Sequence, residues 1–484
     1  MLDDSLHAQF AAILPPAALL TSAEDTRPYE CDGLTLFRER PAAVLLPESE
    51  AQVVAILKAC FEARIPVVAR GAGTSLSGGA LPDARGVVLS LAKFRKILAI
   101  DPLTRTATVQ PGVRNLAISE AAAVHGLFYA PDPSSQIACS IGGNVAENAG
   151  GVHCLKYGLT VHNVRRVRAV LITGETVEFG GDAQDSAGYD LLALINGSEG
   201  LLAVITEITV KLCAKPQQAQ VALAAFADVE QAGAAVGAII GAGIIPAGLE
   251  MMDQTATRAV EQFVHANYPL DAAAVLLVES DGTHEEVAAE MAEIKRVLAE
   301  AGATEIRVSK DEAQRELFWS GRKAAFPAVG RISPDYYCID GTIPRAALPR
   351  MLREIALWSK EFGLTCANVF HAGDGNLHPL ILFDANKPGE SDKTIEFGDR
   401  ILRLCIEVGG TITGEHGVGV EKLSSMCVQF TSAELERFHA IKHAFDAHEL
   451  LNPGKAVPTL ARCGEFGKKP VHAGQVLHPD IPRF

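Results

Sequence analysis

Apolar runs and helical patterns alternate through the first half of the chain, and each run ends at a turn signal. Residues 41–47 form an apolar run bounded by prolines, which predicts a strand. Ser49 and Gln52 then make a capping box, and the apolar residues after them recur at helical spacing. Residues 1–36 mix a helical pattern with two adjacent prolines and are expected to form an N-terminal arm. The same patterns predict further strands at 67–69, 87–91, 97–101 and 106–110, and a helix at 115–125.

The second half of the chain shows a different sequence pattern, in which predicted helices rich in Ala and Glu alternate with predicted strands. This mixture predicts a second α+β domain from about residue 216. Residues 232–249 carry no charge and could be mistaken for a membrane span, but five glycines and Pro246 favour a buried helix that leads into a turn and a strand. The elements expected here include strands at 274–279 and 336–339, a hairpin at 366–383 and a helix from 432 to about 448.

Two clusters of glycine and small polar residues mark a ligand-binding region. The first, Arg70-Gly71-Ala72-Gly73-Thr74-Ser75, follows directly on the strand 67–69. Glycines let successive backbone N–H groups turn toward an anion, and the arginine and hydroxyls add donors. This cluster matches neither G-x-G-x-x-G nor the Walker A pattern, which disfavours nicotinamide and nucleoside triphosphate ligands. The alternative is a flexible loop without a ligand.

The second cluster extends from Pro131 through Ser135 to Gly151 and also offers hydroxyl and amide donors. Together the two clusters favour one long ligand with a pyrophosphate and a planar ring, so a dinucleotide fits better than a mononucleotide. A third glycine turn at 196–200 precedes a strand at 205–211. Polar residues at alternating positions of that strand predict one buried and one exposed face.

The hairpin at 366–383 carries two histidines. With Asp374-Gly375 as the two loop residues of a type I′ turn, His371 lies opposite His378. Directly opposed residues have Cβ atoms roughly 4.5–5.5 Å apart, so both imidazoles could reach one divalent cation. The alternative is a pair of polar hairpin residues with no ligand.

A carboxylate and an imidazole stand side by side about forty residues further on, at Glu415 and His416. Neighbours in an extended chain face opposite ways, so Glu415 could be a third metal ligand while His416 remains free as a base. The alternative is a surface pair in a glycine-rich turn.

Composition narrows the class of protein. A length of 484 residues, with 48% hydrophobic and 21% charged, allows two or more globular domains. The net charge of −15 argues against nucleic acid or an anionic membrane surface as the main partner. Ten cysteines without a C-x-x-C pair are typical of reduced thiols in a cytoplasmic protein and include no iron–sulfur motif. The N-terminus lacks the basic segment of a signal peptide, so no export is expected.

The order of the motifs is itself informative, because the three glycine clusters precede H-A-G-D-G-N-L-H at 371–378, G-E-H-G-V-G at 414–419 and L-L-N-P-G-K at 450–455. In this order they resemble the FAD-linked 2-hydroxyacid dehydrogenase family, whose flavin domain is shared with vanillyl-alcohol oxidase. The resemblance covers roughly residues 37–456. It implies an α+β fold with an FAD-binding domain of two subdomains and a substrate-binding cap domain built on an antiparallel sheet.

The domain boundaries expected on this basis are an arm at 1–36, the FAD-binding domain at 37–215, the substrate- and metal-binding domain at 216–456 and an extended tail at 457–484. The C-terminal helix of the third segment is expected to return to the flavin. FAD is expected to bind without a covalent bond, because the first loop reads Gly73-Thr74-Ser75 where covalent relatives often have a histidine. The residues that match FAD-contacting segments of the family are Arg70, Gly71, Ala72, Gly73, Thr74, Ser75, Pro131, Asp132, Ser135, Gly142, Gly143, Asn144, Asn148, Glu199, Ile205 and Asn452.

The resemblance also implies the chemistry, which is oxidation of a short 2-hydroxy acid to the 2-oxo acid. His371, His378 and Glu415 would hold a divalent metal, and such a donor set suits zinc, manganese or iron. His416 would take the hydroxyl proton. Arg322 matches an arginine that binds the substrate carboxylate in relatives, and the alternative is a surface arginine on a helix.

A departure from the family at two positions refines the expected substrate. Relatives that oxidise D-2-hydroxyglutarate carry polar groups near the positions of Cys338 and Leu380, so an apolar lining here predicts a short monocarboxylate, glycolate or D-lactate. Electrons are expected to pass to an iron–sulfur partner subunit, beside a second flavin-type subunit, or to a quinone chain. The expected location is the cytoplasm, either free or held peripherally at the inner face of the membrane by partners. The alternatives are a stand-alone D-lactate dehydrogenase and a catalytically silent flavoprotein subunit.

Overall fold

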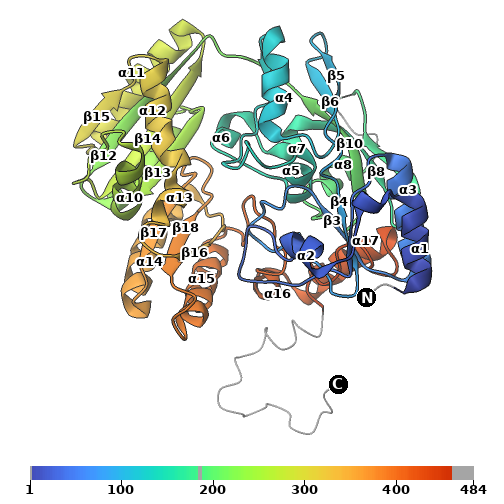
Figure 1. The fold of residues 1–484 in the computed structure, drawn as a ribbon. Coiled ribbons are helices and arrows are strands. Elements are labelled where there is room, and N and C mark those ends of the chain that lie inside the picture. Colours follow the sequence, from blue (N-terminus) through green and yellow to red (C-terminus); the bar gives the residue numbers. More distant parts are fainter. Residues whose placement is uncertain (1–2, 184–187, 460–484) are drawn as a thin grey trace.

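The computed structural model describes residues 3–183 and 188–459, which form two lobes side by side (Figure 1). The tail predicted from residue 457 onward lies outside the described residues beyond residue 459. In the first lobe a four-stranded sheet has the order β1-β2-β4-β3, with β2, β3 and β4 parallel. Its strands are β1 Leu19–Leu20, β2 Ala43–Leu45, β3 Val67–Arg70 and β4 Val87–Ser90.

Two helices pack together on this sheet, α1 Asp4–Ile13 and α3 Glu50–Ala63. Leu6 and Phe10 of α1 are buried in the same apolar cluster as Val53 and Ile56 of α3, so the segment expected as an arm is part of the core of this lobe. The predicted start of α3 is confirmed, since the Ser49 side chain accepts a hydrogen bond from the Gln52 backbone N–H.

A five-stranded antiparallel sheet of order β5-β6-β10-β8-β9 forms the second part of this lobe. The prediction that one face of the strand β10 is exposed is wrong, because β10 is the central strand of this sheet and Thr206 and Thr209 are buried. Both hydroxyls have partners, Glu50 Oε2 at 2.7 Å and Thr108 Oγ1 at 3.1 Å, which removes the cost of burying them. The elements are β5 Ile97–Asp101, β6 Thr106–Val109, β8 Val164–Val170, β9 Thr176–Gly180 and β10 Val204–Lys211, with β7 Leu127–Phe128 and β11 Cys213–Ala214 paired separately.

Short helices connect these strands and surround the glycine clusters. The helix predicted at 115–125 is confirmed as an α-helix followed by a 3₁₀ turn, and it ends at Gly126, whose φ is +67°. These helices are α2 Ala23–Thr26, α4 Asn115–Ala122, α5 Ile141–Glu147, α6 Cys154–Tyr157, α7 Thr160–Asn163 and α8 Leu191–Ile195, with 3₁₀ turns at Pro16–Ala18, Arg27–Tyr29 and Ala123–His125.

The second lobe contains a seven-stranded sheet, antiparallel throughout, which confirms the predicted antiparallel cap. Its order is β15-β12-β14-β13-β17-β18-β16. The strands are β12 Gln218–Phe226, β13 Gly248–Asp253, β14 Ala274–Gly282, β15 Glu305–Val308, β16 Asp335–Cys338, β17 Cys366–Phe370 and β18 Pro379–Phe383.

Helices cover both faces of this sheet and enclose two separate apolar cores. Residues 232–249 form most of a buried helix followed by a turn and the start of β13, as predicted. Within 3–183 and 188–459, no helix is both long and apolar enough to cross a membrane. One face carries α9 Val229–Gly241, α11 His284–Glu300, α14 Leu348–Phe362 and α15 Glu390–Glu407, and the other carries α10 Gln254–Val264, α12 Glu312–Lys323 and α13 Ala325–Val329.

The hairpin of β17 and β18 exists, but its register differs from the prediction. His371 forms a bridge with Asn376 rather than His378, so the loop has four residues, 372–375. Gly375 adopts φ +87° there, and its N–H donates to the His371 carbonyl at 3.1 Å. Side chains alternate with a period of two, so a shift of two residues leaves both histidines on the same face of the sheet. Their ring centroids are 5.0 Å apart.

The C-terminal segment returns to the first lobe (Figure 1). It contains α16 Leu423–Gln429 and α17 Ser432–Phe445. Leu451 forms a parallel bridge with Val67 at the edge of the four-stranded sheet. The buried ammonium group of Lys442 donates to the carbonyls of Leu201 and Leu451, which fixes α17 against the first lobe.

A polar cluster of His153, Asp132, Glu279 and Arg315 joins the two lobes. His153 of the first lobe contacts Asp132 Oδ2 at 2.8 Å and Glu279 Oε1 of β14 at 3.1 Å. Burial lowers the pKa of His153, but the two carboxylates outweigh it and hold that pKa well above its ordinary value. Burial likewise raises the pKa of Glu279, but His153 and Arg315 outweigh it and lower that pKa to about 2.

These shifts predict that the interface is most stable between about pH 4.5 and 6.5, the ordinary values of the two groups. Below that window the contribution of Glu279 is lost as pH falls toward 2, and above it the contribution of His153 is lost as pH rises through its folded pKa. His153→Gln should lower the stability of the FAD-loaded protein by roughly 2–3 kcal/mol at pH 6, the usual loss for hydrogen bonds to charged groups. Thermal unfolding of both proteins across pH checks this, and identical pH profiles would contradict it.

Candidate active site

A single cavity of about 390 Å³ is bordered by both glycine clusters and by residues of the hairpin and the 414–419 turn. Ser75 Oγ donates to the His416 carbonyl at 3.4 Å, so the first cluster touches the turn directly. The second cluster is equally close, because a Cβ added at Gly150 would lie 2.7 Å from Glu415 Oε2. The sequence-predicted residues on the cavity wall are Arg70, Gly71, Ala72, Gly73, Thr74, Ser75, Ser135, Gly142, Gly143, Asn144, Glu199, Ile205, His378, Glu415 and His416.

The first glycine cluster has the features of an anion cradle. Within the described chain, the backbone N–H groups of residues 71–75 have no hydrogen-bond partner in the protein. Ser140 Oγ, at the start of α5, is buried and also without a partner among the described residues. A Cβ at Gly71 would lie 2.2 Å from that oxygen. Free donors around a surface that only glycine permits fit the pyrophosphate of FAD.

Gly71→Ala is therefore expected to weaken FAD binding by at least tenfold, because the new methyl group occupies the space between the loop and Ser140. The measurement is FAD retained after purification, followed by titration of the apoprotein with FAD. Gly237→Ala is the matched control, since Gly237 lies in α9 with nothing within 4 Å of its added Cβ. A Gly71→Ala protein that retains FAD as the wild type does would contradict the cradle assignment.

The other predicted cofactor residues lie behind this wall. Asp132 accepts hydrogen bonds from His153, and the Asn148 side chain accepts one from the Val161 backbone. Asn452 donates to the carbonyls of Gly79 and Glu199 and so supports the wall from the C-terminal segment. Pro131 contributes its carbonyl as an acceptor for Asn115. Their predicted contact with FAD stays a prediction.

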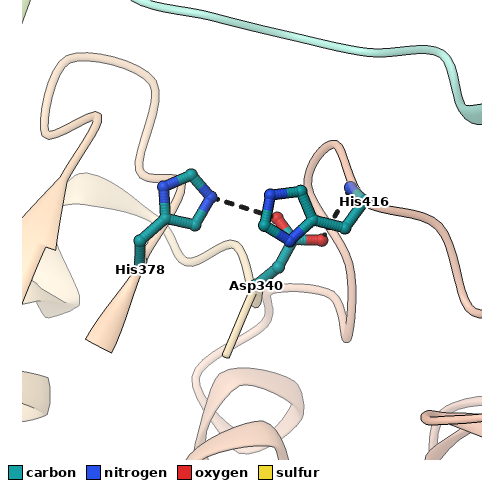
Figure 2. A group of neighbouring side chains, drawn as sticks. All are labelled: Asp340, His378 and His416. Carbon is teal, nitrogen blue, oxygen red and sulfur yellow. Dashed lines mark hydrogen bonds and ion pairs between the residues drawn. The ribbon is translucent and has the colours of Figure 1, made fainter. Parts of the chain in front are cut away.

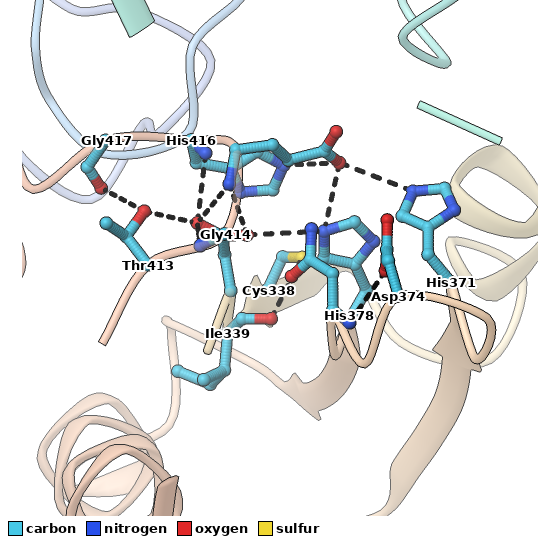
Figure 3. A network of polar contacts seen from close by, with 12 residues as sticks. Cys338, Ile339, His371, Asp374, His378, Thr413, Gly414, His416 and Gly417 are labelled. Atoms are coloured by element: carbon cyan, nitrogen blue, oxygen red, sulfur yellow. Dashed lines mark hydrogen bonds and ion pairs between the residues drawn. The ribbon is translucent and has the colours of Figure 1, made fainter. Parts of the chain in front are cut away.

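His371, His378 and Glu415 offer ligand atoms that lie within 4.8 Å of one another. Figure 3 shows His371 and His378 side by side. The Nε2 atoms of the two histidines lie 3.4 Å and 3.1 Å from Glu415 Oε1. Neither nitrogen has a hydrogen-bond partner among the described residues, and Glu415 Oε2 has none either. Burial lowers the pKa of His371, but Glu250 and Glu415 outweigh it and raise that pKa well above its ordinary value. The site thus favours positive charge, and its nitrogen and oxygen donors fit a divalent cation.

A second group, Asp340, His378 and His416, also has donor atoms close together (Figure 2). Asp340 Oδ2 already accepts from the His416 backbone N–H at 3.0 Å and from Lys422 Nζ at 3.1 Å. Burial raises the pKa of Asp340, but Lys422 and the histidines outweigh it and hold that pKa well below its ordinary value. We therefore interpret Asp340 as the anchor of the turn, which makes the first group the better candidate for a cation.

His416 lies at the edge of this cluster and faces the cavity. Its ring stacks on that of His378, with centroids 4.9 Å apart and planes inclined by 2°. Burial lowers the pKa of His416 to about 4, so its imidazole is neutral near pH 7. Its Nδ1 atom is buried and has no partner within the described residues. A neutral ring with a free nitrogen can accept a proton.

Arg322 of α12 is buried rather than a surface residue, with 1% of its area exposed. Its Nε donates to Glu250 Oε2 at 2.6 Å, and its second terminal nitrogen, Nη2, has no partner in the described chain. The apolar lining predicted from Cys338 and Leu380 is wrong, because these residues pair across β16 and β18 inside a core and do not border the cavity. The cap side of the cavity is instead bordered by Lys323, Phe326, Pro327 and Tyr336.

Sequence reasoning missed three charged residues at the site, Glu250, Asp340 and Lys422. All three are almost fully buried, and each makes an ion pair there. Glu250 stands within the short apolar run at 247–252, and Asp340 directly follows the apolar residues 337–339. A charge in such a run has to be paired when buried, which is the signal that could have found them.

The cysteines can be compared with the prediction that all of them are reduced thiols. Eight of the ten predicted reduced cysteines are free thiols in the structure, Cys427 is disulfide-bonded, against the prediction, and Cys463 lies outside the described residues. The free thiols are Cys31, Cys60, Cys139, Cys154, Cys213, Cys338, Cys366 and Cys405.

Comparison with known proteins agrees with this arrangement. Residues 41–180 match the FAD binding domain family, and residues 215–456 match the family of the C-terminal domain of FAD linked oxidases. The chain is 60% identical to the glycolate oxidase subunit GlcD of Escherichia coli K12 over 97% of this chain and 94% of that one. It is 32% identical to a D-lactate dehydrogenase of Anaerostipes hadrus over 91% of this chain and 95% of that one.

Among solved structures, p-cresol methylhydroxylase with bound substrate superimposes with a TM-score of 0.79 at 17% identity, covering 95% of this chain and 97% of that one. At that identity the likeness shows the fold alone. The flavin cradle is therefore joined to a cap of the oxidase type, and the resemblance of the motifs to FAD-linked 2-hydroxyacid dehydrogenases is confirmed. The chain belongs to the family of FAD-linked oxidases and is an FAD-dependent enzyme that oxidises hydroxy acids.

Proposed function

We propose that the substrate of this enzyme is glycolate, which it oxidises to the corresponding 2-oxo acid. The observation that carries the proposal is that one cavity is bordered by the glycine cradle, by His378 and Glu415, and by His416. His371 completes the cluster from behind, with its Nε2 atom 3.4 Å from Glu415 Oε1. Oxidation of a hydroxy acid needs a two-electron acceptor, a hold on the hydroxyl and carboxylate, and a base for the hydroxyl proton. Relatives named for glycolate share 60% identity with this chain, which supports the choice of substrate.

The residues of the first lobe would hold FAD without a covalent bond, through the donors of residues 70–75 and 140–144. When bound, FAD supplies the electron acceptor. His371, His378 and Glu415 would hold zinc, manganese or iron, which when bound orients the substrate oxygens and lowers the pKa of the hydroxyl group.

The proton has a defined destination in this arrangement. His416 is neutral, faces the cavity and lies against His378, so it is placed beside any hydroxyl group held by the histidine cluster. The His416 backbone N–H donates to Asp340, which keeps the turn in place while the ring takes up the proton. Arg322 does not border the cavity itself, but the next residue, Lys323, does, and the buried Nη2 of Arg322 has no partner among the described residues. We propose this guanidinium group as the cation for the substrate carboxylate.

A second candidate substrate, D-lactate, is favoured by the relatives that carry that name, including the one from Anaerostipes hadrus. The two acids differ by one methyl group. A hydrophobic contact with one methyl group is worth only about 1–3 kcal/mol, so the cavity could discriminate between them by roughly 10–200-fold.

The test is anaerobic mixing of the FAD-loaded, metal-loaded protein with glycolate or with D-lactate, followed by the loss of the oxidised flavin absorbance band. Faster reduction by glycolate is the expected result. Faster reduction by D-lactate would favour D-lactate as the substrate. Reduction by neither acid would favour the alternative that the protein is a catalytically silent flavoprotein subunit. A purified protein that stays colourless after reconstitution with FAD would contradict the whole proposal.

The electron acceptor is proposed to be an iron–sulfur partner subunit in an assembly with a second flavin-type subunit. The E. coli relative is named as a subunit, which supports an assembly. The ten cysteines of this chain lack an iron–sulfur spacing, so a cluster would have to be in another chain. Such an assembly would place the protein in the cytoplasm. With partners that bind the membrane, it would lie at the inner face of that membrane.

A further inference from the structure

Glu250 is one of two buried carboxylates in the strand β13, the other being Asp253 at the end of the strand. It lies in β13, in the sequence Gly-Leu-Glu-Met-Met-Asp, and only 1% of its area is exposed. The register of β13 and β17 pairs Met251 with Phe370 and Met252 with Val369, and one further step places Glu250 opposite His371. Opposed residues on one face of a sheet are in reach of each other.

The two oxygens of Glu250 have different partners. Oε1 lies 2.7 Å from His371 Nδ1, and Oε2 accepts from Arg322 Nε at 2.6 Å. All three side chains are at least 97% buried, so these contacts are shielded from solvent. Hydrogen bonds to ionised groups in such surroundings are stronger than neutral ones.

Each contact fixes a group that the active site needs. A proton held on His371 Nδ1 by a carboxylate leaves Nε2 with a free lone pair, and Nε2 is the atom beside Glu415. The bond to Arg322 Nε fixes the plane of the guanidinium group and leaves its buried Nη2 without a partner among the described residues. One carboxylate therefore orients a metal ligand and an anion-binding group at once.

We infer that Glu250 is a positioning residue that couples the metal ligand His371 to the substrate-binding Arg322, so that loss of its charge weakens both sites together. This inference rests on the proposed function, because it takes the histidine cluster as a metal site and Arg322 as the carboxylate contact. Glutamine has nearly the same shape as glutamate. Its amide oxygen can accept from only one of the two donors, while its NH₂ group faces the other.

The test compares Glu250→Gln with wild type and with Asp253→Asn, all as full-length, FAD-loaded proteins. Asp253 is a matched control, because it is a buried carboxylate three residues further along β13 that bonds Asn368 and caps α10. The first measurement is titration of the metal-free protein with Zn²⁺ or Mn²⁺ alone by equilibrium dialysis. The second is titration with oxalate at saturating metal, followed by the change in the flavin spectrum.

Glu250→Gln is expected to bind the metal roughly 10–100-fold more weakly, the usual effect of losing the partner of a ligating histidine. Oxalate binding should fall at least tenfold even with metal in excess, and Asp253→Asn should resemble the wild type in both titrations. A Glu250→Gln protein that retains FAD and binds both ligands as the wild type does would overturn the inference, as would loss of metal binding alone with normal oxalate affinity.

Loss of FAD from the variant and absence of metal from the wild type can each be distinguished from failure of the inference about Glu250. If Glu250→Gln does not retain FAD, Glu250→Asp replaces it, because aspartate keeps the charge but is too short to reach both donors. Wild-type affinities in Glu250→Asp would then overturn the inference. If the wild type itself takes up no metal, the metal site of the proposed function is wrong, whereas a wild type that binds metal beside an unaffected variant refutes only the role of Glu250.

Discussion

Replacing His416 with alanine is expected to leave FAD bound but to slow its reduction by glycolate by roughly 10²–10⁴-fold, the usual contribution of a positioned base. The ring faces the cavity, and its Nδ1 is buried without a partner in the described chain. The hydrogen bond from Ser75 Oγ goes to the His416 backbone carbonyl, so this link to the glycine cradle does not need the His416 side chain. The rate of flavin reduction under anaerobic conditions measures the effect.

The matched control is His443→Ala, which removes a histidine of α17 that is 56% exposed and does not border the cavity. It should reduce flavin at the wild-type rate. If His416→Ala were also as fast as wild type, another group would have to take the hydroxyl proton. Metal content must be measured in the same samples, since His416 stacks on His378, one of the proposed metal ligands.

Glu415→Gln is expected to lose both the metal and about 10³-fold in activity, while FAD remains bound. Glu415 supplies the negative charge between the Nε2 atoms of His371 and His378. Polarisation of a substrate oxygen by a metal contributes several kcal/mol to the transition state, which sets the size of the loss. Metal analysis of the purified variant and flavin reduction at rising concentrations of Zn²⁺, Mn²⁺ or Fe²⁺ give the result.

Treatment of the wild type with a chelator should reproduce this loss, and adding the metal back should reverse it in the wild type far more than in Glu415→Gln. Glu436→Gln, which changes an exposed carboxylate of α17, is the control for the loss of one charge. A Glu415→Gln protein with normal metal content and normal activity would place the cation elsewhere, and the group of Asp340, His378 and His416 would be the next candidate.

Local signals in the sequence predicted much of the fold and part of the site. The capping box of α3, the strand before the first glycine cluster and the glycine at the end of the 115–125 helical segment all depend on near neighbours in the chain. The hairpin was predicted for the same reason, but its register was not. Asp374-Gly375 suits a two-residue loop and also a longer one, and here Asp374 Oδ1 accepts from the Asn376 backbone N–H within a four-residue loop.

Contacts between distant parts of the chain could not be predicted from one sequence. Glu250 and His371 are 121 positions apart, and Asp340 and Lys422 are 82 apart. No local pattern links such pairs, so the supporting carboxylates of the site were missed. The expected role of Cys338 and Leu380 failed for a related reason, because position near a site in the sequence does not decide which side of a strand faces the cavity.

The turn that carries Glu415 and His416 is bound to both lobes. Asp340 of the cap holds its first part, while both oxygens of Glu199, from the FAD-binding lobe, accept from the backbone N–H groups of Val418 and Gly419 at 2.7 Å. Gly417 between them leaves no room for a side chain, since an added Cβ would lie 2.0 Å from Glu147 Oε2. Glu415 and His416 are thus tied to the FAD-binding lobe by backbone hydrogen bonds. Substitutions at the cap residues Phe326 and Tyr336 are therefore expected to reshape the cavity while leaving these bonds intact.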